Sequence, residues 1–379
     1  MGIVGTLTRA FMHGPNWQDA HGLDDFLELL DKRTDVEGRQ RGLITGMRQK
    51  VMDEVMELTN PSQYPTTSAC TIDDPLIWGV LPFRYHFNLD NHRWSLGSYD
   101  IVFRNKAMSA FFVLGQVLPT HRLHKDPHGG PFQPTLREAI RLLSHPPFTP
   151  TSSALPVDHS LQSPDISDPF SSPNDHLTYT TDGVDTFPAP SAYARRQYAW
   201  IHIFPEGRVH QHPHKAMRYF KWGVARLILE PDVCPDIVPM WLEGNDEIMH
   251  ENRAGPRWVP RVGKRCGVWF GANVGGESEG NVFHELRERW RRLVEDDRRK
   301  RKAGRELERG VLSEELKYGP EAVKLREECT MQVRGAVLKV RKGRGLPDED
   351  PKEGLVETWR AEGGKREGQM DDGSLVKDT

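Results

Sequence analysis

The chain has 379 residues, which is long enough to bury one large hydrophobic core or two smaller ones. Its 51 basic and 54 acidic residues leave a net charge of −3, which argues against a nucleic-acid partner. No apolar run reaches the roughly 18–20 residues that a membrane-spanning helix needs. The four cysteines are too scattered for a disulfide framework or a zinc site. We therefore expect a soluble or surface-attached protein without a structural metal.

Residues 1–45 predict an N-terminal surface segment, a helix and a first strand. The first 14 residues carry no secretory signal, and the sequence leaves open whether they form an amphipathic anchor. Leu23 to Leu30 has apolar residues at helical spacing and acidic residues in the first turn, where the helix dipole favours them. Arg41 and Gly42 then indicate a turn that enters a strand running to Thr45.

Residues 71–275 predict one domain, preceded by a segment, 46–70, that follows no regular pattern. Within the domain, residues 146–190 are rich in Pro, Ser, Thr and Asp and predict a disordered surface insertion. Strands are predicted at Tyr198–Phe204, Ile237–Leu242 and Val268–Phe270, and a helix at Ala216–Leu229. Strands that alternate with helices on both sides of the insertion predict a single α/β layer domain.

Residues 276–379 predict a charged helical extension. An apolar stripe that begins at Phe283 and Leu286 runs among many Arg and Glu residues, and a flexible tail is expected from about Gly343. The basic run Arg298–Lys302 is interpreted as a solvated helix face, with a weak contact to anionic lipid left open.

Four short sequence blocks carry the functional signal. They are DDPLIWGVLP at Asp73–Pro82, FRNK and GQVLPTHR within Phe103–Arg122, FPEG at Phe204–Gly207 followed by MRYFKWG at Met217–Gly223, and VPMWLEG at Val238–Gly244. In this order and spacing they resemble the glycerolphosphate acyltransferase superfamily, and DDPLIWG, GQVLPTHR and MRYFKWG are similar to the tafazzins within it. The resemblance covers about residues 22–45 and 73–244 without the insertion.

The resemblance implies a catalytic histidine–aspartate pair in the first block, which normally reads Asn-His-x-x-x-x-Asp. Asp73 corresponds to the aspartate, which would orient the imidazole that removes a proton from a lysophospholipid hydroxyl. The histidine should stand at position 68, where this chain has Ser68. A serine cannot accept that proton at neutral pH. Either the chain is an inactive relative, or residues 46–70 are a wrongly translated stretch, which we favour because the sequence on both sides fits the family.

Two histidine arrangements compete with this interpretation. His121 and Asp126 reproduce the His-x-x-x-x-Asp spacing, but they follow the second block in a loop, so we interpret the match as coincidental. The run His210-Gln211-His212-Pro213-His214 is typical of a metal site only when a cysteine or acidic cluster accompanies it. It is interpreted as a polar loop, and no metal is expected.

The resemblance also implies three substrate-binding residues. Arg122 would hold the substrate phosphate through its guanidinium fork, and the alternative is a surface ion pair. Glu206 and Gly207 would contact the glycerol portion of the lipid, although Glu206 could instead cap a following helix.

The fold implied is a glycerolphosphate-acyltransferase-like domain, a mixed sheet flanked by helices and attached to one membrane leaflet. Leu76–Phe83, Ala110–Leu118 and Lys221–Leu229 are the expected sources of lipid contact. The implied activity moves an acyl chain from a phospholipid such as phosphatidylcholine to monolysocardiolipin, without a cofactor, on mitochondrial membranes facing the intermembrane space. An acyl-CoA-dependent lysophospholipid acyltransferase and a catalytically dead membrane-binding protein are the alternatives. Oligomeric state is not predicted.

Overall fold

The computed structural model describes residues 2–47, 73–123, 125–148, 178–207, 210–211, 214–248, 259–278, 280–301, 307–360, 367–369 and 375–377. Most of the anomalous segment 46–70 and of the insertion 146–190 therefore lies outside the described residues. Within the described ranges, every helix is either too short or too polar to cross a lipid bilayer.

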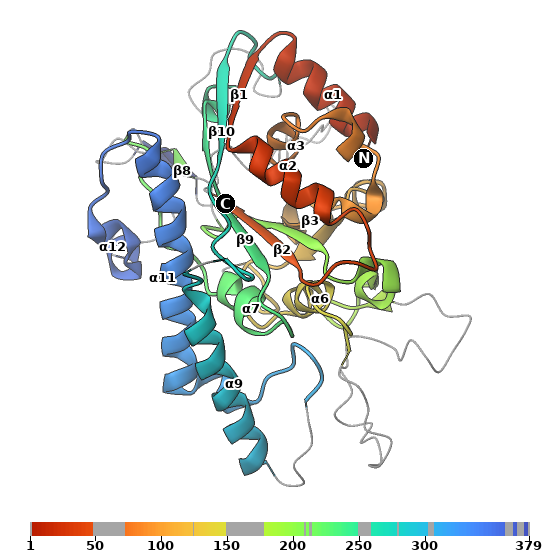
Figure 1. Ribbon diagram of the computed structural model, residues 1–379, viewed down its shortest axis with the longest axis vertical. Coiled ribbons are helices and arrows are strands. Elements are labelled where there is room, and N and C mark those ends of the chain that lie inside the picture. The colour runs from red at the N-terminus through yellow and green to blue at the C-terminus, as the bar shows by residue number, and fades with distance from the viewer. Residues whose placement is uncertain are drawn as a thin grey trace.

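A seven-stranded mixed sheet forms the centre of the molecule (Figure 1). In spatial order its strands are β1 (Trp17–His21), β10 (Arg265–Phe270), β9 (Asp236–Glu243), β2 (Leu43–Met47), β7 (Trp200–Ile203), β3 (Arg93–Ser98) and β4 (Val117–Thr120). The five strands from β9 to β4 are parallel, whereas β10 runs antiparallel to β9 and β1 runs parallel to β10. The predicted strands that became β2, β7, β9 and β10 are confirmed, as is the mixed sheet flanked by helices.

Helices cover both faces of this sheet (Figure 1). On one face lie α1 (Gly2–His13), α2 (Leu23–Lys32) and α3 (Asp73–Trp78), and on the other lie α6 (Pro134–Leu142), α7 (Gly223–Leu229), α9 (Phe283–Lys300) and α11 (Pro320–Gly343). Side chains alternate between faces along a strand, so Leu43 packs with Phe26 of α2 whereas Ile44 packs with Ile228 of α7. The strands are apolar on both faces because both are covered.

Short elements complete the fold at the edges of the sheet. The helices are α4 (Tyr99–Val102), α5 (Lys106–Leu114), α8 (Asn245–Ile248), α10 (Glu314–Tyr318) and α12 (Val356–Arg360). The strands are β5 (Thr178–Tyr179), β6 (Phe187–Pro188), β8 (His210–Gln211), β11 (Glu367–Gln369) and β12 (Leu375–Lys377). The 3₁₀ turns used below are η1 (Phe83–His86), η2 (Leu89–Asn91) and η6 (Pro351–Gly354).

The end of the predicted disordered insertion is in fact structured. Residues 178–190 form the β5–β6 hairpin, and Tyr179 and Phe187 are buried in a small core with Ile101 and Phe103. The average composition of residues 146–190 does not reveal this short apolar part. It becomes ordered because it packs against the apolar residues of α4.

Two further expectations are wrong. The predicted helix Ala216–Leu229 is only α7, and the stretch before it is a loop in which the backbone N–H groups of Met217 and Arg218 donate to the side chains of Glu349 and Glu206. The predicted flexible tail from Gly343 contains η6 and α12, and the Glu349 side chain is only 3% exposed.

The three segments expected to contact lipid differ in how far they are exposed to solvent. Residues 224–229 of α7 are buried between the sheet and the C-terminal helices, so the expectation for Lys221–Leu229 is wrong for that part. Ile77–Leu81 is likewise core. Phe83, Phe111 and Leu114 are exposed.

Candidate active site

The predicted site residues follow strands that end at the same edge of the sheet. Arg122 comes two residues after β4, and Glu206 comes three residues after β7. Both strands are parallel to β2, which leads toward the first block. Carboxyl ends of parallel strands share one edge, the usual place for ligands in open α/β sheets. Since β3 lies between β4 and β7, the backbones at the two strand ends are about 10 Å apart.

The first block begins α3, and its second aspartate is deeply buried. The side chain of Asp73 and position 68 lie outside the described residues. Asp74 accepts hydrogen bonds from Arg93 Nε at 2.7 Å and Arg93 Nη2 at 2.5 Å, from Trp78 Nε1 at 2.8 Å, and from Ser95 Oγ at 3.0 Å. Burial alone would raise the pKa of Asp74, but the positive charge of Arg93 and these hydrogen bonds lower it to about 2. Asp74 therefore fixes α3, and with it Asp73, to strand β3.

A fully buried histidine lies beside the Asp74–Arg93 ion pair. His202 Nδ1 is 2.8 Å from Thr45 Oγ1, which also accepts a hydrogen bond from Trp200 Nε1 at 2.9 Å. Burial lowers the pKa of His202 to about 4, with Asp74 opposing and Arg93 adding to the effect. The imidazole is therefore neutral at pH 7, and its Nε2 has no hydrogen-bond partner among the residues that the structure describes. Sequence reasoning missed His202, although a single polar residue within an otherwise apolar strand was the available signal.

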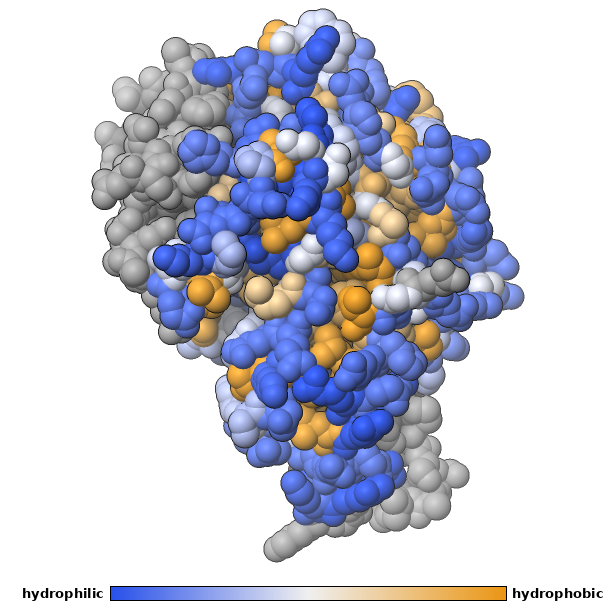
Figure 2. Space-filling model, turned by 60° about the vertical axis from the view of Figure 1, so that its left-hand side comes forward, coloured by the Kyte–Doolittle hydropathy of each residue, from blue (hydrophilic) through white to orange (hydrophobic). Residues whose placement is uncertain are grey.

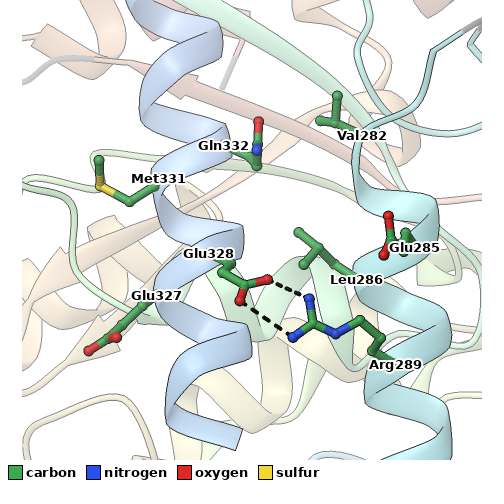
Figure 3. Close-up of a pocket in the computed structure, with 8 residues that line it drawn as sticks. All are labelled: Val282, Glu285, Leu286, Arg289, Glu327, Glu328, Met331 and Gln332. Carbon is green, nitrogen blue, oxygen red and sulfur yellow. Dashed lines mark hydrogen bonds and ion pairs between the residues drawn. The ribbon is translucent and has the colours of Figure 1, made fainter. Parts of the chain in front are cut away.

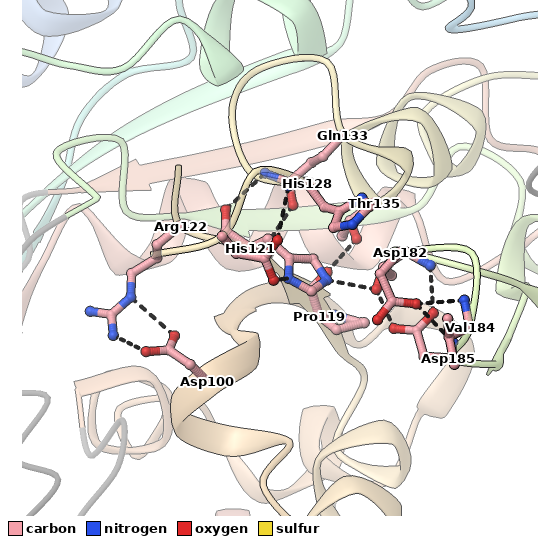
Figure 4. Close-up of polar contacts among 12 residues, drawn as sticks. Asp100, Pro119, His121, Arg122, His128, Gln133, Thr135, Asp182, Val184 and Asp185 are labelled. Atoms are coloured by element: carbon pink, nitrogen blue, oxygen red, sulfur yellow. Dashed lines mark hydrogen bonds and ion pairs between the residues drawn. The ribbon is translucent and has the colours of Figure 1, made fainter. Parts of the chain in front are cut away.

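Arg122 is held by an aspartate from α4. Its Nε donates to Asp100 Oδ1 at 3.0 Å and its Nη2 donates to Asp100 Oδ2 (Figure 4). Lys125 Nζ lies 3.3 Å from the same Oδ2 atom. Burial opposes ionisation of Asp100, but the hydrogen bond and charge of Arg122 lower its pKa overall. The Arg122 side chain is 13% exposed, so its fork is oriented and partly shielded from water.

His121 and Asp126 do form a hydrogen-bonded pair, but its imidazole is buried. His121 Nδ1 is 2.7 Å from Asp126 Oδ2, and Nε2 is 2.7 Å from Thr181 Oγ1 (Figure 4). The ring stacks on Tyr99 with centroids 4.4 Å apart, and the residue is 5% exposed. Both ring nitrogens are engaged and a substrate hydroxyl has no access to them. The pair joins the chain after β4 to the β5–β6 hairpin, which agrees with the interpretation that it is not the base.

Glu206 and Gly207 form a tight turn after β7. Gly207 N donates to Phe204 O at 3.0 Å, and the residue has a left-handed φ of 59°. Glycine serves this left-handed backbone conformation, whereas the nearest atoms to an added Cβ belong to the flexible end of the Lys221 side chain, which can move aside. Glu206 is 2% exposed, and its Oε2 accepts from Arg218 N at 2.9 Å. Its carboxylate thus binds the loop before α7 rather than the first turn of that helix.

An open groove of about 610 Å³ lies elsewhere, between α9 and α11 (Figure 3). Arg289 and Glu328 face each other across it at 2.5 Å, beside the apolar Leu286 and Met331. Its lining contains neither a histidine nor any of the predicted site residues. The surrounding surface, turned forward in Figure 2, is mostly hydrophilic with small hydrophobic patches.

Comparison with known proteins decides the family. The chain is 34% identical over 293 residues to a protein of Saccharomyces cerevisiae named tafazzin, covering 76% of this chain and 68% of that protein. The chain belongs to the tafazzin family. A Dictyostelium discoideum relative of the same family is 27% identical, with 59% of this chain and 58% of that protein covered. An N-acylphosphatidylethanolamine synthase of Arabidopsis thaliana is 28% identical over 54% of this chain and 52% of that protein. No protein-family model matches the chain.

By its family the chain is an acyltransferase, and the elements on both sides of the anomalous segment are formed. Strand β2 and helix α3 are both in place, on either side of residues 48–72, which lie outside the described residues. The departure at Ser68 is therefore confined to the stretch between two well-formed elements. Among the described residues, no three His, Cys, Asp or Glu side chains lie together in a way that could hold a metal ion.

Proposed function

We propose that this tafazzin-family fold exchanges acyl chains between phospholipids, moving one from a donor such as phosphatidylcholine to monolysocardiolipin. The observation that supports this is the gathering of the family's blocks at one edge of the sheet, with a shielded arginine fork after β4 and a carboxylate turn after β7. No cofactor is needed, because the acyl chain already sits in a phospholipid ester.

In this proposal the reaction needs only a base and a phosphate anchor. An imidazole oriented by Asp73 would take the proton from the acceptor hydroxyl, whose oxygen attacks the donor ester carbonyl. The tetrahedral intermediate would then expel the donor lysophospholipid oxygen, which takes the proton back from the imidazole. Arg122 would hold a substrate phosphate, and Glu206 and Gly207 would contact the glycerol. With Ser68 in place of the histidine, this chain as written lacks the base.

We further propose that the protein lies on one leaflet of a mitochondrial membrane, on the intermembrane-space side. Support comes from α1, where Ile3 is 76% and Leu7 is 65% exposed, and from Phe87, which is 65% exposed and lies against Gly2. Arg9, in contrast, turns inward and donates to the backbone carbonyls of the three residues that follow α3. An outward apolar face of this kind suits insertion into the boundary between headgroups and acyl chains.

The decisive experiment replaces residues 46–72 with a short strand end that carries Asn-His-x-x-x-x-Asp73, and compares it with the same variant carrying Ala for His. With labelled phosphatidylcholine and monolysocardiolipin, the histidine variant should transfer the acyl chain, whereas the alanine variant and the chain as written should not. Transfer from acyl-CoA alone would refute the transacylase and favour the CoA-dependent alternative. Absence of transfer from either donor would favour the catalytically dead protein, which Ser68 supports.

A further inference from the structure

After α11 the chain returns to the loop that follows the Glu206–Gly207 turn of the candidate site. In Figure 1, α12 and β8 lie beside α11. Strand β12, near the C-terminus, pairs antiparallel with β8, which follows the Glu206–Gly207 turn by three residues. Residues about 165 positions downstream of β8 therefore contact the same loop, between β7 and α7.

A buried ionic cluster makes the second contact. Glu349 Oε2 is 2.7 Å from Arg334 Nη2, and Glu349 Oε1 is 3.5 Å from Arg341 Nε. The three side chains are 3–4% exposed. A carboxylate with two guanidinium groups at this depth is costly to bury unless its hydrogen-bonding positions are filled. It is retained here although nothing in the sequence blocks assigns it a role.

Arg341 Nη1 donates to Pro347 O within the C-terminal segment, and the other hydrogen bonds described for this cluster go to the loop between β7 and α7. Glu349 Oε1 accepts from Met217 N at 2.7 Å, while Arg334 donates to Met217 O at 2.7 Å and to Arg218 O at 3.1 Å. Arg341 Nη2 donates to His214 O at 3.2 Å. The N–H of Arg218 is the group that binds Glu206 Oε2. One peptide segment is thus held by the C-terminal cluster on one side and by Glu206 on the other.

We propose that Glu349, with Arg334, is a positioning residue for the acyl-transfer site, which makes the C-terminal segment an integral part of that site. This rests on the proposed function of Glu206 and Gly207. Extended backbone cannot satisfy its own N–H and C=O groups, so a buried loop needs partners from elsewhere. The cluster supplies these partners and so positions the Arg218 amide. That amide in turn positions the Glu206 carboxylate.

Hydrogen exchange on the full chain tests the clamp directly. Glu349→Gln should lower the protection of the Met217 and Arg218 amides by on the order of tenfold to a hundredfold, the factor expected for a lost charge-assisted hydrogen bond. Amides of β2 and β9 should keep their protection. The matched control is Asp348→Asn, because Asp348 is the neighbouring acid, its side chain is 75% exposed, and it forms a surface ion pair with Lys342 at 3.1 Å. Unchanged protection in Glu349→Gln would overturn the inference.

Binding tests whether the clamp acts on the site. A short-chain lysophosphatidylcholine, kept below its micelle concentration and titrated by calorimetry, should bind Glu349→Gln about tenfold more weakly than the parent chain. Equal affinity together with lost protection would also overturn the inference. If the parent itself does not bind, the proposed function fails, and the exchange result still decides the clamp. Should Glu349→Gln not fold, Arg334→Lys keeps the charge but loses the fork, and the same two readouts apply.

Discussion

The neutral, buried His202 makes the pH dependence of stability a sharp test of the structure. Its side chain is fully buried, and burial lowers its pKa from the ordinary 6.5 to about 4. Because the folded-state pKa is lowered, the unfolded chain binds the proton first as the pH falls. The contribution of His202 to stability is therefore complete above pH 6.5 and is lost progressively as the pH falls toward 4.

The size of this effect follows from the pKa difference. A fall from 6.5 to about 4 corresponds to about 3 kcal/mol of unfolding free energy, since each pKa unit is worth about 1.4 kcal/mol. His202→Asn keeps a hydrogen-bonding group near Nδ1, close to Thr45, but cannot titrate. We expect it to be less stable than the parent at pH 7 by about 1–3 kcal/mol, through the cavity and altered polar contacts. We also expect its stability to fall about 3 kcal/mol less between pH 6.5 and 4.

Urea unfolding followed by tryptophan fluorescence measures both quantities, with Trp78 and Trp200 next to the imidazole as reporters. His92, whose pKa burial lowers to about 3, adds its own slope over the same range, so the stability curve of the His202→Asn variant is not completely flat. His21→Gln is the control, because His21 is exposed. A parent and a His202→Asn variant with parallel stability curves from pH 6.5 to 4 would refute a buried neutral imidazole.

Three further outcomes are expected. Asp74→Asn should lower the free energy of unfolding at pH 7 by about 3–5 kcal/mol, because it leaves the buried Arg93 guanidinium without its carboxylate. In the same urea titration the control Glu288→Gln, which removes an exposed ion pair with Arg291, should lower it by less than about 1 kcal/mol. In the variant with the histidine restored, Arg122→Ala should lower kcat/KM roughly tenfold to a hundredfold and Arg122→Lys should rescue it only partly; unchanged kinetics would remove Arg122 from the site. Ile3→Asp should reduce flotation with vesicles in high salt, and full release of the parent by salt alone would contradict apolar attachment.

The order of the four blocks and the main strands could be predicted because they depend on local pattern. The runs that became β2, β7 and β9 are strand-length and mostly apolar, which is typical of strands covered on both faces. The tight turn at Gly207 also follows from its residue type, and its positive φ agrees. The amphipathic stripe of α9 is likewise a local signal, and Phe283, Leu286 and Trp290 are buried as it requires.

The tertiary structure alone decided which charged side chains are buried and what they hold. Arg93 meets Asp74 from 19 residues away, and Glu349 meets Met217 across 132 residues. In sequence these residues look like ordinary surface charges, and composition even predicted a flexible tail around Glu349. A charge leaves water only when the fold supplies its partner. Hydrophobic periodicity fixes each element locally, but the match between a buried charge and its partner exists only once distant segments are brought together.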